Sequence, residues 1–156
     1  MTTPTPPRQI DSVVDLVQLV EMSEVRTYRL SGERVADSED REPAQSLTML
    51  VGGDAEHIEC RVRMMLGTVA ADLQADIGAV YTISEPVALT SEIVAEFTER
   101  VALMAVFPFL REAVFTTASR LGVPPPVLGL LRAGEARVEF DADVTWPPRG
   151  DSATAH

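Results

Sequence analysis

The chain has 156 residues, which is short for two domains and long enough for one domain with a hydrophobic core. It carries 13 basic and 24 acidic residues, a formal net charge of −11, and every basic residue is Arg. Without Lys, P-loop NTPases and Schiff-base enzymes are excluded, and the acidic balance disfavours nucleic-acid or anionic-membrane binding. One Cys and two His exclude a disulfide framework and a Cys/His zinc site within one chain.

No targeting or membrane segment is predicted. The N-terminal stretch MTTPTPPRQI is polar and Pro-rich, unlike a signal peptide. The longest apolar run, Val101 to Leu110, falls well short of the ~20 residues that span a bilayer. We therefore expect a cytoplasmic protein in which this run forms a buried helix.

The first third of the chain changes from helical to strand periodicity. Residues 1–9 are predicted to be a disordered arm because prolines are frequent there. Apolar residues at helical spacing predict a helix from Ile10 to Met22, with Asp11 or Ser12 as its N-cap. Looser alternation predicts a strand from Val25 to Val35, followed by a charged loop.

Three further strands follow without a helix between them. Alternating apolar residues predict strands over Leu47–Val51, Ile58–Leu66 and Ala70–Ser84, and Gly52-Gly53-Asp54 marks a turn. Gly78, inside the last of these strands, indicates a bulge or a close backbone approach. Consecutive strands without helical crossovers predict an α+β fold built on a four-stranded antiparallel β-meander.

The helical period returns after Leu89. Thr90 or Ser91 is the expected N-cap, and one apolar face is predicted to comprise Ile93, Phe97, Val101 and Met104. Pro108 lacks an N–H and clashes with the preceding turn, so it is expected to break this long helical region and to begin a second helix. That second helix is predicted to end at Gly122.

The last part of the chain divides at residue 131. Pro124–Leu131 is predicted to be extended and apolar, and residues 132–156 form an acidic tail. Within the tail, Val138–Trp146 alternates apolar and polar residues, which favours an added edge strand. The alternative is a loose tail that docks into a groove of its own chain or of a partner.

No catalytic constellation is predicted. Nucleophilic catalysis needs a Ser or Cys beside an oriented His. His57 adjoins a turn, where a surface His is expected, and Cys60 lies on the apolar side of its strand. The acidic residues fall in a loop or on a solvated helix face, so we expect no enzyme, no metal and no cofactor.

One stretch is specific enough to indicate a family. Phe107-Pro108-Phe109-Leu110-Arg111-Glu112 begins a helix, Arg120-Leu121-Gly122 ends it, and a Pro-rich apolar segment follows. This stretch resembles the SecB chaperone family, and the preceding four strands have the family's order. The Lys-free composition and the helix before the first strand are similar to the actinobacterial SecB-like branch, some members of which serve toxin–antitoxin pairs. Residues 10–131 are then the SecB-like domain.

The resemblance implies an ATP-independent holdase: a homotetramer, built as a dimer of dimers, that holds unfolded polypeptides in apolar grooves. The clients would be pre-proteins for Sec export or an aggregation-prone antitoxin. The first strand carries Arg26 and Arg29 where export members place acidic residues that dock the SecA motor. This departure argues against SecA docking at the first strand. The residues predicted to dock SecA or another partner are instead Asp72 and Asp76, which keep some acidity on the fourth strand. The residues expected to contact clients are Tyr28, Met49, Phe107, Phe109, Leu128, Leu130 and Leu131.

Two alternatives come from other functional classes. A long helix on an antiparallel sheet is also typical of hot-dog-type enzymes and small-ligand binders, which need a carboxylate or His facing a pocket near the helix start. Glu92 and Glu96 fall on the polar side of the expected helix, which weakens this alternative. The third hypothesis is an obligate subunit whose apolar segment is buried against one fixed protein partner.

Overall fold

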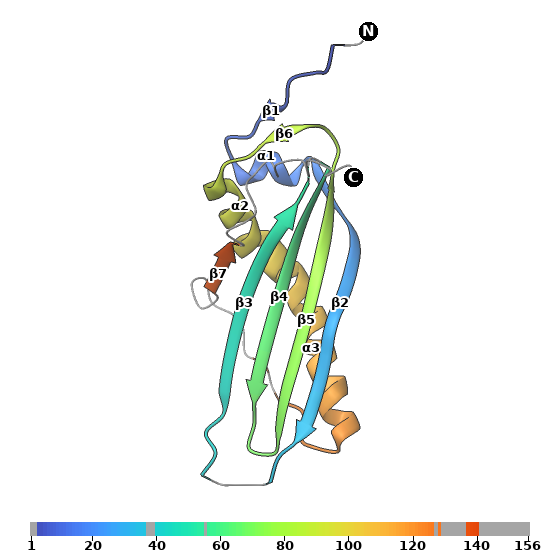
Figure 1. Cartoon of the computed structure of the whole chain (residues 1–156), viewed down its shortest axis with the longest axis vertical. Coiled ribbons are helices and arrows are strands. Elements are labelled where there is room, and N and C mark those ends of the chain that lie inside the picture. Colours follow the sequence, from blue (N-terminus) through green and yellow to red (C-terminus); the bar gives the residue numbers. More distant parts are fainter. Residues whose placement is uncertain (1–2, 37–39, 55, 127, 129–136, 141–156) are drawn as a thin grey trace, which may run out of the picture.

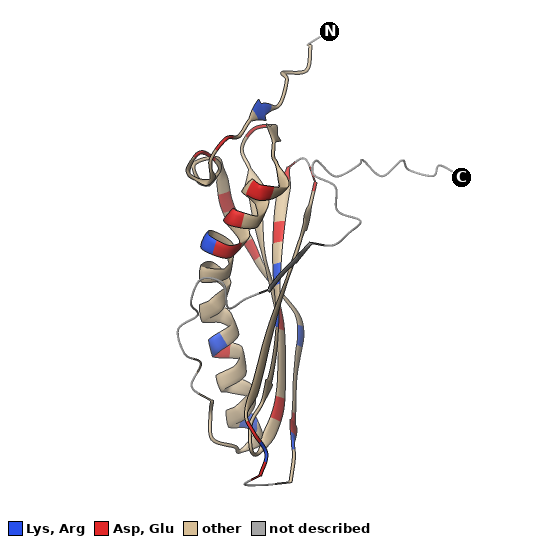
Figure 2. Cartoon of the chain, turned by 90° about the vertical axis from the view of Figure 1, so that its left-hand side faces the viewer, with Lys and Arg blue, Asp and Glu red and all other residues tan. Residues whose placement is uncertain are grey.

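A computed structural model describes residues 3–36, 40–54, 56–126, 128 and 137–140. Its centre is an antiparallel sheet with a long helix lying along one face (Figures 1 and 2). Four long strands form the sheet: β2 (Val20–Arg34), β3 (Ala44–Gly53), β4 (His57–Gly67) and β5 (Ala71–Ile83). The predicted α+β class and the four antiparallel strands are confirmed.

The strand order differs from the predicted meander. The strands lie in the order β2-β5-β4-β3, so β3, β4 and β5 are consecutive hairpins while β2 pairs with β5. This is a Greek-key arrangement, in which β2 and β3 follow each other in the chain but are three positions apart in the sheet. The meander was wrong because alternation predicts strands without saying which are neighbours, and a longer loop adds little closure entropy.

The N-terminal segment contains less helix than predicted. Helix α1 spans only Val13–Val17, capped by Ser12, whose Oγ accepts a hydrogen bond from the Asp15 N–H. Val20–Met22, expected to be helical, instead pairs with β5 as the start of β2. The β-branched and apolar residues there satisfy either period, and the ladder with β5 decides between them.

The arm expected over residues 1–9 is partly ordered. Its last two residues form β1 (Arg8–Gln9), which pairs in parallel with β6 (Val87–Ala88). Arg8 also forms an ion pair with Glu85 at 3.1 Å. The following residue, Ile10, is buried in the core, so the folded part of the chain begins at Arg8.

The helical region after Leu89 is continuous through Pro108. It consists of α2 (Ser91–Phe97), a π-helical turn η1 (Thr98–Ala102) and α3 (Leu103–Leu121). Thr90 caps α2 as predicted, and Gly122 ends α3 in the left-handed conformation. The predicted break at Pro108 is wrong: Pro108 lies inside α3, on its exposed side, and the irregular turn comes six residues earlier.

The π-helical turn changes which residues face the sheet. A π turn contains one residue more than an α turn, which rotates the following helix by about 100°. Ala102, Leu103 and Val106 are therefore buried, whereas Met104, which we predicted on the buried face, is exposed. The Thr98 hydroxyl donates to the Val94 carbonyl at 2.7 Å and lies against Cys60 of β4.

The core lies between this helix and one face of the sheet. Alternate residues of β3, β4 and β5 are buried against the helix, and Tyr81 meets Phe97 edge-on with ring centroids 5.1 Å apart. Gly32 of β2 allows the closest approach, because a β-carbon there would lie 2.6 Å from Thr117 Cγ2 and 2.8 Å from Leu121 Cδ1. The sheet face opposite the helix carries no described helix and is called the open face below.

The acidic tail contributes one described strand. β7 (Arg137–Phe140) pairs in parallel with β3, from Thr48 opposite Arg137 to Val51 opposite Phe140. Of the tail strand expected over Val138–Trp146, the part after Phe140 lies outside the described residues. Of the extended segment predicted over Pro124–Leu131, Leu130 and Leu131 also lie outside them.

The close approach of α3 to β2 predicts a measurable packing cost. Gly32→Ala is expected to lower the free energy of unfolding by about 1–3 kcal/mol, because the added methyl group displaces Thr117 and Leu121. Urea unfolding at equilibrium measures this change. Gly67→Ala is the matched control, since a β-carbon there meets nothing closer than the mobile end of Arg41 at 3.4 Å. Equal stability of the two variants would contradict the tight contact.

Candidate functional site

Helix α3 exposes three large apolar side chains, on two sides of the helix. Met104, Phe109 and Phe115 have exposed fractions of 56%, 41% and 56%. Met104 and Phe115 are eleven residues apart, about three helical turns, and lie on one side of α3, whereas Phe109 lies on another. Charged residues are sparse on this helix: Arg111, Glu112 and Arg120 are the only ones in its 19 residues (Figure 2).

The helical region from Ser91 to Leu121 is unusually apolar for one that is only partly buried. By length and hydropathy it would qualify as a membrane span, a test that core helices of soluble proteins also pass. Only 44% of the most apolar 18-residue stretch of this region is buried within the chain. Exposed apolar side chains on such a helix are candidates for contact with another polypeptide or an apolar ligand.

The open face of the sheet is held together by a buried carboxylate. Asp76 of β5 is 1% exposed and accepts hydrogen bonds from Arg61 Nε at 2.7 Å, Arg61 Nη2 at 2.8 Å and Arg63 Nε at 3.2 Å. Burial alone raises the pKa of Asp76, but the two guanidinium groups outweigh it and hold the pKa below its ordinary value. Asp76 is therefore ionised at neutral pH and joins β4 to β5.

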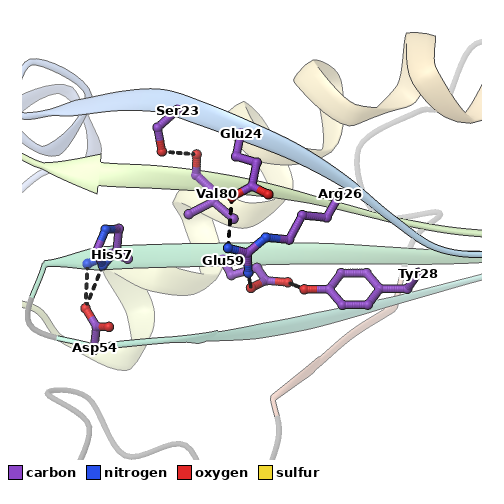
Figure 3. Close-up of polar contacts among 8 residues, drawn as sticks. All are labelled: Ser23, Glu24, Arg26, Tyr28, Asp54, His57, Glu59 and Val80. Carbon is purple, nitrogen blue, oxygen red and sulfur yellow. Dashed lines mark hydrogen bonds and ion pairs between the residues drawn. The ribbon is translucent and has the colours of Figure 1, made fainter.

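Tyr28 lies beside this ion pair and is half exposed. The Arg61 guanidinium lies 4.0 Å from the centre of the Tyr28 ring, and the Tyr28 hydroxyl donates to Glu59. Arg26 donates to Glu59 at 3.3 Å and to Glu24 at 2.8 Å (Figure 3). Gly78 makes room for the ring, because a β-carbon there would lie 3.0 Å from Tyr28 Cε2. These contacts hold an aromatic side chain flat on an otherwise charged surface.

The residues predicted to contact clients are not all on the surface. Tyr28, on the open face of the sheet, and Phe109, on α3, are both exposed. Met49, Phe107 and Leu128 are buried, which contradicts the expectation that they present surface to a client. Met49 lies on the helix-facing side of β3, and Phe107 lies on the side of α3 that the π-helical turn rotates toward the sheet.

The two carboxylates predicted to dock a partner have different environments. Asp72 is exposed and pairs with Arg41. Asp76 is covered by Arg61 and Arg63, so it offers no carboxylate to a partner. The sequence does not reveal this, because the partners of Asp76 come from β4, 13 and 15 residues away, and only the strand register brings them together.

Sequence reasoning missed the exposure of Phe115 and Met65. Both are about half exposed, Phe115 on α3 and Met65 on the open face of β4. Phe115 would have been found by extending the helical periodicity from Leu110, Val114 and Ala118, which places it outside the buried side. For Met65 the signal was available: it follows Glu59, Arg61 and Arg63 at period two.

Candidate catalytic groups have structural partners. His57 Nδ1 lies 3.0 Å from Asp54 Oδ1, which also accepts the backbone N–H groups of Glu56 and His57 and so closes the turn (Figure 3). Cys60 is fully buried, and burial raises the pKa of its thiol to about 12. Among the described residues no group of three or more His, Cys, Asp or Glu is arranged to hold a metal ion.

Comparison with known proteins identifies the family. No protein-family model matches the sequence. The chain is 34% identical over 133 residues to the SecB-like chaperone SmegB of Mycolicibacterium smegmatis, covering 85% of this chain and 90% of the relative. The chain belongs to the SecB-like chaperone family.

A solved structure of the family has the same fold. It is a SecB-like chaperone of Mycobacterium tuberculosis in complex with a ChAD peptide from the HigA1 antitoxin. It superimposes with a TM-score of 0.64 at 18% identity, covering 76% of this chain and 92% of that one. Membership in this family makes the chain a chaperone and not an enzyme, which removes the hot-dog-type enzyme alternative.

The Asp76 ion pair predicts a pH-dependent loss of stability. Asp76→Asn is expected to lower the free energy of unfolding by about 3 kcal/mol at pH 7, because it leaves Arg61 and Arg63 without a carboxylate. The folded-state pKa of Asp76 is lowered, so its contribution is complete above pH ~4 and is lost as the pH falls through that pKa.

Urea unfolding at pH 7, 5 and 3 measures this dependence. The stability gap between wild type and Asp76→Asn is expected to narrow at pH 3. Asp72→Asn serves as the control, since an exposed ion pair contributes less than about 1 kcal/mol. A gap of the same size at all three pH values would argue against the ion pair as the source of the stability.

Cys60 is expected to be chemically inert in the folded protein. The thiol is buried and its pKa is raised to about 12, so the thiolate that attacks disulfide reagents is scarce at pH 8. Ellman's reagent is expected to react with Cys60 only after unfolding in urea. Met65→Cys places a thiol on the open face and is expected to react at once. Fast reaction of the wild type would contradict the burial of Cys60.

Proposed function

We propose that this chaperone is an ATP-independent holdase that binds unfolded, extended polypeptide segments through exposed apolar side chains. The observation that carries the proposal is that α3, a helix with few charges, leaves Met104, Phe109 and Phe115 exposed. Covering such a surface with the apolar side chains of an unfolded chain is favourable at about 25 cal/mol per Å². It needs no chemical step, so it needs no nucleotide.

The binding is proposed to be weak at each contact and strong in sum. Burying the exposed part of one Phe contributes about 1 kcal/mol, about fivefold in affinity. One such contact on each subunit, repeated over the subunits of an assembly, lets a long client bind through several weak sites at once. Folded proteins bury their apolar residues and offer few such contacts, which accounts for selectivity toward unfolded chains.

The assembly is proposed to be a homotetramer, built as a dimer of dimers, in the cytoplasm. Met104 and Phe115, on the same side of α3, are the residues proposed to be covered by another subunit. Phe109 lies on another side of the helix and is left for the client. The net charge of −11 per chain keeps an assembly with exposed apolar surface in solution.

Between the two clients considered, the structural data favour an antitoxin over pre-proteins for export. The related chaperone of Mycobacterium tuberculosis was solved with an antitoxin peptide. Docking of SecA was expected at Asp72 and Asp76, and the burial of Asp76 under two Arg side chains leaves that pair incomplete. We therefore propose a dedicated aggregation-prone antitoxin as the main client, and the Sec export role as secondary.

The holdase proposal is tested by suppression of aggregation of a chemically unfolded model protein without nucleotide. Wild type is expected to prevent aggregation at a near-stoichiometric ratio. Phe109→Ser is expected to raise the half-effective concentration about fivefold, because one exposed aromatic contact is lost. Glu112→Gln, also exposed on α3, is the control and is expected to behave as wild type.

Light scattering of the same samples separates client binding from assembly. Both variants are expected to keep the mass of a homotetramer. If wild type leaves aggregation unchanged, general holdase activity is wrong, and a single fixed protein partner becomes the better hypothesis. If Phe109→Ser loses activity only by dissociating, Phe109 is an assembly residue and not a client contact.

A further inference from the structure

The two edges of the sheet differ in how they are protected. Edge strand β2 carries six charged residues among its 15, and its pairing with β5 shifts register at Met22/Glu24 and at Thr27/Arg29. Charges and bulges are the usual means by which an edge strand is kept from pairing with another chain. The β2 edge is therefore protected along its own length.

The opposite edge, β3, has neither form of protection. Its ten residues, AQSLTMLVGG, contain no charged side chain, and ten consecutive residues pair with β4 without a register shift. A regular, uncharged strand with a free edge is a ready template for an additional strand. Among the described residues, β7 is the one segment that pairs with this edge (Figure 1).

β7 covers this edge incompletely. It pairs with Thr48–Val51 only, so no described residue pairs with the outer side of Ala44–Leu47 or of Gly52–Gly53. The pairing is parallel, which is slightly less stable per residue than antiparallel pairing. An extended segment from another chain that pairs with most of β3 would form more backbone hydrogen bonds than β7 does and would displace it.

We propose that β7 is a built-in competitor for the β3 edge, which an extended client segment displaces by adding a strand to the sheet. The inference rests on the proposed function, because it names where and how a client strand binds. The sequence of β7, Arg-Val-Glu-Phe, alternates charged and apolar residues. The occupant that fits is therefore an extended polypeptide with apolar side chains at alternate positions, which all point to one face of the sheet.

Because β7 belongs to the same chain as β3, it influences which client segments can bind. A strand on the same chain acts at a local concentration in the millimolar range, so short or weakly pairing segments do not displace it. A client must supply enough paired residues to exceed the four of β7. The tail thereby selects long unfolded segments and covers an aggregation-prone edge while no client is bound.

The test uses the full chain with a proline in the tail. Glu139→Pro removes a backbone N–H from the middle of β7 and is expected to open the β3 edge. Ala153→Pro, outside β7 in the same tail, is the matched control. The probe is a fluorescein-labelled peptide with the sequence of residues 135–146, titrated by fluorescence anisotropy against wild type and both variants.

Glu139→Pro is expected to bind the probe about tenfold more tightly than wild type. This factor assumes that β7 occupies the β3 edge in ~90% of wild-type molecules, which leaves about one molecule in ten free to bind. Ala153→Pro is expected to match wild type. Adding Ser46→Lys to Glu139→Pro places a charge on the exposed start of β3 and is expected to reverse the gain. Amides of Thr48–Val51 are expected to exchange faster in Glu139→Pro than in the control.

Probe affinity of Glu139→Pro equal to that of wild type would overturn the proposal, as would an equal gain in Ala153→Pro. The aggregation assay distinguishes this from failure of the proposed function. If wild type suppresses aggregation and Glu139→Pro has no tighter probe binding, the holdase stands and the competitor role is wrong. If the variant gains probe affinity while no form suppresses aggregation, the edge is gated by the tail but does not serve a general holdase.

Discussion

The rotation of the long helix about its own axis decides which of its apolar side chains are buried and which are exposed. The π-helical turn at Thr98–Ala102 adds one residue ahead of α3, and the Thr98 hydroxyl bonded to the Val94 carbonyl lies against Cys60 of the sheet. With this rotation, Leu103, Val106 and Leu110 fill the core. Met104, Phe109 and Phe115 of the helix remain exposed, and they make up the surface that we propose for binding other polypeptides.

The two faces of the sheet have opposite characters because each strand alternates its side chains. The face beneath the helix is apolar, whereas the open face is joined by the Asp76 ion pairs and the Tyr28–Glu59 contact. A buried carboxylate between two guanidinium groups tolerates little change of register, so this face holds β4 and β5 in place. The open face thereby stabilises the sheet on which the helix packs, and Tyr28 is an aromatic side chain exposed on it.

The two edges of the sheet differ in charge and in regularity. β2 is bulged and charged, whereas β3 is regular, uncharged and covered over four residues by β7. A chaperone that was protected at both edges would have no backbone groups to offer an unfolded segment. In our proposal, covering one edge with a short strand from the same chain keeps a client site available and limits aggregation.

The sequence by itself determined the local structure and the family. Ser12, Thr90 and Gly122 mark helix ends through their own side-chain or backbone preferences, alternation identified the strands, and the Phe107–Leu131 stretch indicated the SecB-like family. The tertiary structure alone decided the Greek-key order, the continuity through Pro108, the burial of Met49 and the partners of Asp76. Each of these depends on which strands are neighbours and on one inserted helical residue, and such long-range pairings leave no periodic trace in a single sequence.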